Sequence, residues 1–113
     1  MKVISAIVRP HRLENVKTAL SDVGVVGLTI TEVRGAGRQK GQIERYRGSE
    51  YSFDLIPKIK VEVAVPDSQY EDALKAIIDA AHTGEIGDGK IFVYTLADAV
   101  RIRTGESGED SLV

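Results

Sequence analysis

The chain has 113 residues, of which 42% are hydrophobic and 28% are charged, which is typical of a single soluble globular domain. Its 15 basic and 17 acidic residues give a formal net charge of −2, which argues against nonspecific binding to nucleic acid through overall charge. The absence of cysteine excludes disulfides and thiolate metal sites. No segment resembles a signal peptide or is apolar for long enough to span a bilayer, so we expect a cytoplasmic protein.

The N-terminal third predicts a strand, a helix and a second strand. Residues 1–9 are rich in β-branched side chains, and Pro10 ends this strand because proline has no N–H to donate to a ladder. Residues 11–24 predict an amphipathic helix with Gly24 as its C-cap, and residues 25–35 predict the second strand. The apolar face of the helix has spacings of three and four: Leu13, Val16, Leu20 and Val23.

Residues 36–54 read AGRQKGQIERYRGSEYSFD and are mostly polar. They show neither the alternation of a strand nor the apolar stripe of a helix, so they predict a long loop. Long loops without structure of their own are usually functional or disordered. We expect this one to be poorly ordered alone and to be ordered by a ligand or a partner.

The rest of the chain predicts a strand, a helix, a strand and a tail. Residues 55–66 alternate strictly; Ile59, Val61, Val63 and Val65 lie on one face, and Lys58, Lys60, Glu62 and Ala64 lie on the other. Asp67 or Ser68 can cap the helix. Residues 91–96 predict the fourth strand, and the last residues of 101–113 are expected to be mobile because they have little to bury. The face of the helix is Tyr70, Ala73, Leu74, Ile77, Ile78 and Ala81.

The order β-α-β-β-α-β predicts an α+β fold, a ferredoxin-like sandwich in which both helices cover one face of an antiparallel sheet. The other face would present Lys58, Lys60 and Glu62. An RNA-binding module that uses the basic loop is the alternative with the same order. Such modules stack bases on aromatic residues of the sheet, and the third strand has none on its open face.

Catalytic residue sets are poorly represented. The two histidines, His11 and His82, have no metal-ligand spacing, and no local signature gathers Ser, His and Asp into a triad. His82 falls near the end of the second helix, where capping accounts for it. A small nucleotide hydrolase is therefore disfavoured; we expect a protein that is not an enzyme, and any ATPase activity to be incidental.

Three short segments have the chemistry of anion binding. Residues 35–41 (GAGRQKG) and 87–90 (GDGK) combine glycines with basic residues, and Arg101 and Arg103 lie two apart, which on an extended segment points both guanidiniums to one face. Each segment alone is more often an ordinary turn or surface, but three in one small chain favour a polyphosphate ligand. Lys58 follows Pro57 at the start of a strand and suits a carboxylate, although an edge lysine that blocks strand pairing has the same pattern.

Four motifs in this order resemble the PII signal-transduction proteins of the GlnB/GlnK type, and the resemblance extends from Met1 to about Thr104. The motifs are GRQKGQ (37–42), YRGSEY (46–51), TGEIGDGKIFV (83–93) and RIRTGE (101–106). The family's T-loop corresponds to residues 36–54, its B-loop to 83–90, and its C-terminal loop and tail to 101–113, within one domain of residues 1–113. A different ligand-sensing ferredoxin-like trimer is the remote alternative.

The resemblance implies a homotrimer that binds ATP or ADP in the clefts between subunits, with Arg103 reaching across from the adjacent one. Mg-ATP would create the site for 2-oxoglutarate, held by the metal, by backbone at Gln39, Lys40 and Gly41, by Gly87, and by Lys58. Gln39 would bind Mg²⁺ through its side-chain oxygen, which is the ligand type that Mg²⁺ prefers. The implied nucleotide contacts are Ile7, Gly27, Thr29, Gly37, Arg38, Gln39, Glu62, Val63, Ala64, Gly87, Asp88, Gly89, Lys90, Arg101 and Arg103.

The resemblance also implies how such a protein signals. The effectors would bias the conformation of the polar loop, and the loop would regulate an ammonium channel or enzymes of nitrogen metabolism, so membrane association would be indirect, through a channel. Tyr51 matches a tyrosine that receives UMP or AMP, and Ser49 a serine that is phosphorylated. Two residues depart from the family: Ala36 stands where many relatives have an aromatic residue, which would alter loop packing at the ligand site, and His11 replaces a common phenylalanine at the surface.

Overall fold

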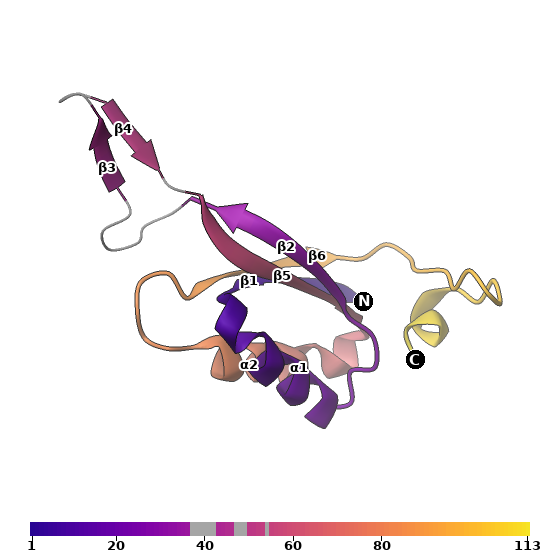
Figure 1. Ribbon diagram of the computed structural model, residues 1–113. Helices are drawn as coiled ribbons and strands as arrows, with labels where there is room; N and C mark the ends of the chain where they lie inside the picture. Colours follow the sequence, from indigo (N-terminus) through magenta and orange to yellow (C-terminus); the bar gives the residue numbers. More distant parts are fainter. Residues whose placement is uncertain (37–42, 47–49, 54) are drawn as a thin grey trace.

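The computed structural model describes residues 1–36 and 55–113 in full, and the backbone of 43–46 and 50–53. Two helices and a sheet form the body, and a two-stranded ribbon extends from it (Figure 1). Within the described ranges, no helix is long and apolar enough to cross a membrane. The elements are β1 (Lys2–Val8), η1 (Pro10–Arg12), α1 (Leu13–Asp22), β2 (Thr29–Gly35), β3 (Ile43–Tyr46), β4 (Glu50–Phe53), β5 (Ile56–Val65), α2 (Asp67–Ala81), β6 (Gly89–Thr95) and η2 (Gly108–Leu112).

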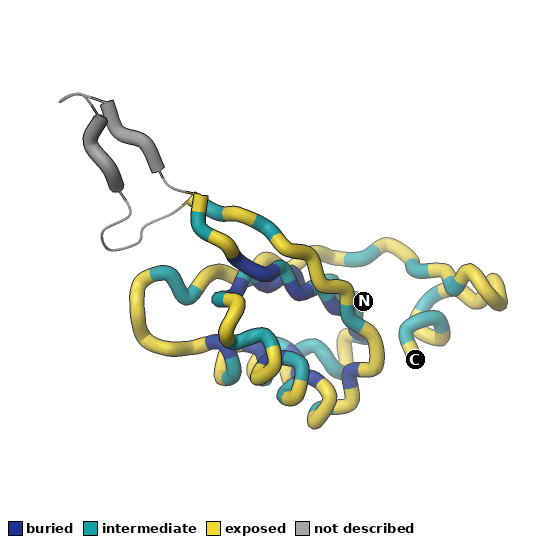
Figure 2. Tube along the Cα trace, in the orientation of Figure 1, coloured by how far each residue is buried: buried dark blue, intermediate teal, exposed yellow. Residues whose placement is uncertain are grey.

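The main sheet has the strand order β2-β5-β1-β6, and every pair in it is antiparallel. Both helices lie on one face of this sheet (Figure 1), and its apolar positions are buried against them (Figure 2). The α+β ferredoxin-like fold predicted from the sequence is therefore confirmed. Fully burying a valine or isoleucine side chain stabilises a fold by about 1.5–3 kcal/mol. The fully buried large side chains are Ile4, Val8, Val16, Leu20, Val61, Val63, Val65 and Ile77.

The helix ends agree only in part with the sequence prediction. Gly24 adopts φ 86° just after the C-cap Val23 of α1, and the N–H groups of Gly24 and Val25 donate to Ser21 and Leu20, which forms a Schellman motif. At the start of α2, the prediction that Asp67 or Ser68 is the N-cap is wrong. Pro66 is the N-cap, and the Asp67 carboxylate instead accepts a hydrogen bond from the N-terminal ammonium at 2.9 Å.

Residues 36–54 contain two strands that the sequence did not indicate. β3 and β4 pair antiparallel, from Ile43 opposite Phe53 to Tyr46 opposite Glu50. The prediction of a loop without strands was wrong because backbone N–H and C=O groups can form a ladder whatever the side-chain pattern is. Residues 37–42, 47–49 and 54 lie outside the described ranges, so the expectation that ligands or partners order this loop stays a prediction.

The C-terminal segment also differs from expectation. Residues 102–104 form a turn, in which the N–H of Gly105 donates to the oxygen of Arg101 at 2.8 Å, so the condition of an extended segment, under which Arg101 and Arg103 would point to one face, is not met. The residues expected to be a mobile end form the 3-10 helix η2 instead. The chain doubles back after the turn, and Val100 pairs with Ser107.

Candidate functional site

Arg9 follows β1 directly, and its guanidinium holds the loop of residues 83–88 that connects α2 to β6 (Figure 1, orange). Nε donates to Oδ1 of Asp88 at 3.1 Å, and Nη2 donates to the main-chain oxygen of Ile86 at 2.9 Å. The two side chains are 20% and 22% exposed, so this ion pair is better shielded from solvent than an ordinary surface pair. The end of β1 and the loop are thereby fixed to one another.

Asp88 organises the same loop from within. Its Oδ2 accepts the N–H groups of Thr83 and Gly84 at 2.8 and 2.9 Å, and its Oδ1 accepts the Thr83 hydroxyl. Partial desolvation acts to raise the pKa of Asp88, but the hydrogen bonds from Thr83, Gly84 and Arg9 outweigh it and hold the pKa well below its usual range. The carboxylate is therefore ionised at physiological pH and neutralises Arg9.

Gly89 lets the loop enter β6 against β1. Its φ is 104°, and a Cβ at this position would lie 1.7 Å from the main-chain oxygen of Ile7. A residue other than glycine would both collide with β1 and adopt a strained backbone conformation. Gly89, the second glycine of GDGK, is thus required for the pairing of β6 with β1 that positions Lys90 and the preceding loop.

Lys58 reaches from β5 to the same loop. Its side chain is buried, and Nζ donates a hydrogen bond to the main-chain oxygen of Gly87. Desolvation and the nearby charge of Arg9 lower the pKa of Lys58, while Asp88 opposes them. The sequence placed Lys58 on the open face of the sheet, and its burial there is a correction: the loop covers the end of the strand and removes the lysine from solvent.

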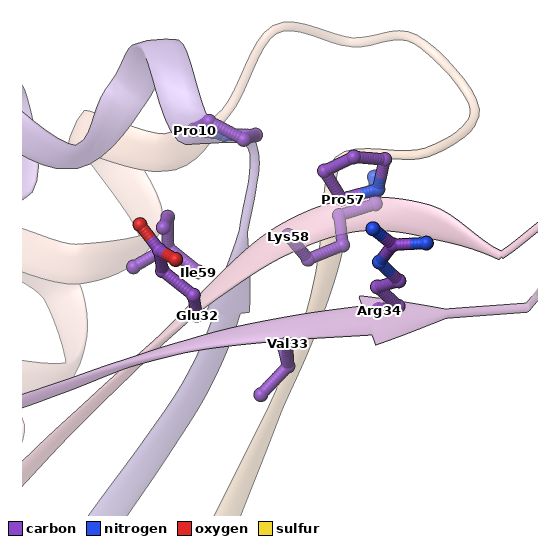
Figure 3. A pocket seen from close by; sticks show the side chains of 7 residues that line it. All are labelled: Pro10, Glu32, Val33, Arg34, Pro57, Lys58 and Ile59. Carbon is purple, nitrogen blue, oxygen red and sulfur yellow. The ribbon is translucent and has the colours of Figure 1, made fainter.

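A pocket of about 450 Å³ lies beside Lys58, at the end of the sheet where β2 and β5 lead into residues 37–54. Figure 3 shows residues of β2 and β5 together with Pro10 around this space. Two cations, Arg34 and Lys58, and one carboxylate, Glu32, line the pocket, so its charge is net positive and it can bind a carboxylate or a phosphate. The residues that line the pocket are Pro10, Glu32, Val33, Arg34, Pro57, Lys58 and Ile59.

The residues that the resemblance assigns to the nucleotide fall into two groups. Gly27, Thr29, Glu62 and Ala64 line one open pocket of about 240 Å³, on the β2–β5 side of the sheet. Ile7, Asp88, Gly89 and Lys90 line a second pocket of about 240 Å³, where β1 and β6 meet the end of α2.

The sheet register separates these two groups. Thr29 is opposite Glu62 on β2 and β5, whereas Ile7 is opposite Lys90 on β1 and β6. Thr29 and Lys90 are therefore three strand spacings apart, or about 14 Å, whereas Ile7 and Glu62 lie on the neighbouring strands β1 and β5. The two pockets lie toward opposite edges of the sheet, and each contains part of the assigned set.

Some residues that the resemblance assigns to the site lie elsewhere in the structure, and others fall outside the described ranges. The Val63 side chain is 2% exposed and belongs to the core, so only its main chain can face a ligand. The backbone of Tyr51 lies in β4 opposite Arg45, and Arg103 is exposed in the turn. The site residues that lie outside the described ranges are Gly37, Arg38, Gln39, Lys40, Gly41 and Ser49.

Arg9 was not among the site residues predicted from the sequence, although it holds the loop of residues 83–88. A basic residue at the last position before the proline that ends a strand, in a fold whose loops gather at that strand end, could have marked it. Ser111 and Leu112 were also missed, although they line the pocket that contains Gly27 and Glu62. His82 lies where expected, as the C-cap of α2, with its N–H donating to the oxygen of Ile78 at 3.0 Å. No cluster of three metal-ligating side chains occurs in the part of the chain that the structure describes.

Comparison with known proteins identifies the family. Residues 1–106 match the family model described as "Nitrogen regulatory protein P-II". Relatives of that name from Haemophilus influenzae and Azospirillum brasilense are each 56% identical over 112 residues, which is 99% of this chain and 100% of theirs. "Nitrogen regulatory protein GlnK" from Escherichia coli K12 is 52% identical over the same share of both chains. The family model covers every element from β1 to β6, and the chain belongs to the P-II family of nitrogen regulatory proteins.

Proposed function

We propose that this chain signals nitrogen, carbon and energy status by binding ATP or ADP and, with Mg-ATP, 2-oxoglutarate. The observation that carries the proposal is the Lys58 ammonium: it is buried at the base of residues 36–54, held by the Gly87 oxygen, and adjacent to Arg9. A dehydrated ammonium that can exchange a neutral carbonyl for a ligand carboxylate gains a charge-assisted hydrogen bond.

The nucleotide would bind between subunits of a homotrimer. Two partial sites on opposite sides of one sheet support this arrangement, because a neighbouring copy can bring one of each kind together. The open face of the sheet supports it too: Phe92 and Tyr94 on β6 lie on that face, 46% and 55% exposed. We assign this face to subunit contact.

The same aromatic side chains are what an RNA-binding module on this fold would need. They lie on an edge strand, next to the exposed Val93, and the family match favours the trimer. Filter binding with single-stranded RNA at moderate salt separates the two proposals, and retention of RNA at micromolar protein would favour the module.

Mg²⁺ would enter with ATP. Gln39 remains the predicted side-chain ligand, with backbone at Lys40 and Gly41 near the bound acid. Mg²⁺ that arrives with ATP takes most of its oxygen ligands from the phosphates and from water, so it needs few protein ligands. The described residues contain no cluster of metal-ligating side chains.

Signalling would pass through the base of the long loop. A carboxylate that binds Lys58 must replace its contact with Gly87, and Lys58 lies two residues after the start of β5, the strand that leads out of residues 36–54. A ligand shifts such a loop only by its differential affinity for the loop's states. A coupling of about 1–3 kcal/mol would change the affinity for an ammonium channel or a nitrogen-metabolism enzyme about 5- to 150-fold.

Titration calorimetry tests the proposal. ATP should bind to the purified chain, and 2-oxoglutarate should bind only when Mg²⁺ and ATP are both present. Equal binding of 2-oxoglutarate without nucleotide would contradict the mechanism. Intact mass spectrometry of protein from nitrogen-starved and ammonium-fed cells tests the modification of Tyr51 or Ser49, and an unchanged mass in both states would remove modification from the proposal.

A further inference from the structure

The C-terminal tail, defined here as residues 108–113, is fastened to the segment that precedes the arginine pair. The hydroxyl of Ser111 lies 3.0 Å from the oxygen of Ala99 and 2.7 Å from that of Gly108, and it can donate its single proton to either one. The N–H of Gly108 donates to the oxygen of Ala99 at 2.9 Å and to Oδ1 of Asp98 at 3.0 Å. These contacts bring the tail back across the turn of residues 102–104.

The folded tail surrounds Arg101 with oxygens. Nη1 donates to the carboxylate of Glu106 at 2.9 Å. Nη2 approaches the main-chain oxygens of Asp110 and Ser111 at 3.4 and 3.5 Å, and it also donates to that of Val113. The side chain is 26% exposed. The Arg101 guanidinium therefore has the surroundings of a guanidinium in an occupied anion site. Oxygens of its own chain take the positions that the oxygens of a ligand would take.

The same tail forms a wall of a proposed nucleotide pocket. Ser111 and Leu112 line the space that also contains Gly27, Thr29 and Glu62. The contacts at Arg101 and at the pocket are independent observations, and both place the tail on surfaces that the nucleotide would use.

We propose that the C-terminal tail is a built-in competitor for nucleotide phosphates, which withholds Arg101 until it undocks. This inference rests on the proposed nucleotide site and adds a regulatory element to it. When a binding-competent state is only partly populated, the apparent dissociation constant rises in proportion. Loosening the tail therefore tightens phosphate binding. A nucleoside without phosphate gains nothing from the release of Arg101, so any change in its affinity reports only the contact of the tail with the pocket of Gly27 and Glu62.

Two variants of the full chain loosen the tail by different means, and each has a matched control. Ser111→Ala removes the hydroxyl that fastens the tail, and its control is Ser68→Ala at an exposed position. Glu106→Gln removes the ion pair with Arg101. Its control is Glu109→Gln, which loses the same charge from an exposed residue that makes no ion pair within the described ranges.

Calorimetry with three probes, Mg-ATP, inorganic tripolyphosphate and adenosine, reads the result. Ser111→Ala and Glu106→Gln should each tighten the binding of Mg-ATP and tripolyphosphate about two- to tenfold, the range expected for one hydrogen bond, and should change the binding of adenosine less. Thermal melting verifies that every variant is folded. Hydrogen exchange of residues 108–113 should rise in both loosened variants.

Each outcome bears on a specific claim. If wild type binds Mg-ATP and the two variants bind it equally or more weakly, the tail is not a competitor, and the proposed function stands. An equal gain in Glu109→Gln would reduce the effect to overall charge and would also overturn the inference. If neither wild type nor any variant binds Mg-ATP, the proposed function fails, and this inference fails with it.

Discussion

The ammonium group of Lys58 on β5 and the main-chain oxygen of Gly87 before β6 form a hydrogen bond between positions 29 residues apart in the chain. Arg9, at the end of β1, donates hydrogen bonds to Asp88 and Ile86 of the same loop. One buried cation thus connects the strand that leads out of residues 36–54 with the glycine-rich loop. This relationship explains why a carboxylate at Lys58 would be sensed by both segments.

Replacing Lys58 by alanine should weaken 2-oxoglutarate binding about 10- to 100-fold, the range expected for loss of a hydrogen bond to a charged group. ADP binding should change less, because the proposed nucleotide contacts at Gly27 and Glu62 are remote from Lys58 in the register. Calorimetry in the presence of Mg-ATP measures the effect. Lys60→Ala is the control on the same strand and face; equal losses in both variants would contradict a specific role for Lys58.

Gly89→Ala should lower the free energy of unfolding by about 3 kcal/mol or more, because the new Cβ would meet the Ile7 oxygen at 1.7 Å in a backbone with φ 104°. Gly105→Ala is the matched control, with φ 75° and no atom within 4 Å of the added carbon. It should lose only about 1 kcal/mol from backbone strain. Urea denaturation compares the two, and similar losses would show that the collision with β1 is relieved.

Asp88 predicts a dependence of stability on pH. Its folded-state pKa is depressed, so its contribution is fully present above the unfolded pKa of about 3.9 and is lost as the pH falls toward the folded value. The stability difference between wild type and Asp88→Asn should be constant above about pH 5 and should shrink below about pH 4. Asp72→Asn controls for removal of one negative charge from an exposed position. A difference that persists unchanged at pH 3 would show that the carboxylate charge does not stabilise the loop.

Phe92→Asp should convert the proposed trimer to monomers, because it places a charge on the open sheet face where Phe92 is 46% exposed. Size-exclusion chromatography with light scattering measures the mass. Ile78→Asp is the control: it changes a residue of similar exposure, 47%, on the helical side of the molecule. A trimer that survives Phe92→Asp and dissociates in Ile78→Asp would place the subunit contact on the helices instead.

The sequence by itself determined the two helices, the four strands of the main sheet and the faces that they bury. The alternation of residues 55–66 and the three-and-four spacing of residues 11–24 correspond to β5 and α1, since burial of one face imposes a period on the side chains. The local side-chain pattern did not predict features that depend on backbone pairing or on an electrostatic contact. β3 and β4 have no apolar stripe, and Asp67 found the N-terminal ammonium in place of a capping role.

Only the tertiary structure decided which charged groups meet. Arg9, Lys58 and Asp88 are separated by 49 and 30 positions, and they converge because β5, β1 and β6 are neighbours whose ends lie together. The surroundings of Arg101 are a similar case. Glu106 and the C-terminal tail fold back onto this segment through hydrogen bonds that leave no periodic pattern in the sequence. Burial of one face imposes a period that can be seen in the sequence. A contact between charged groups depends instead on the register of strands that are far apart in the sequence.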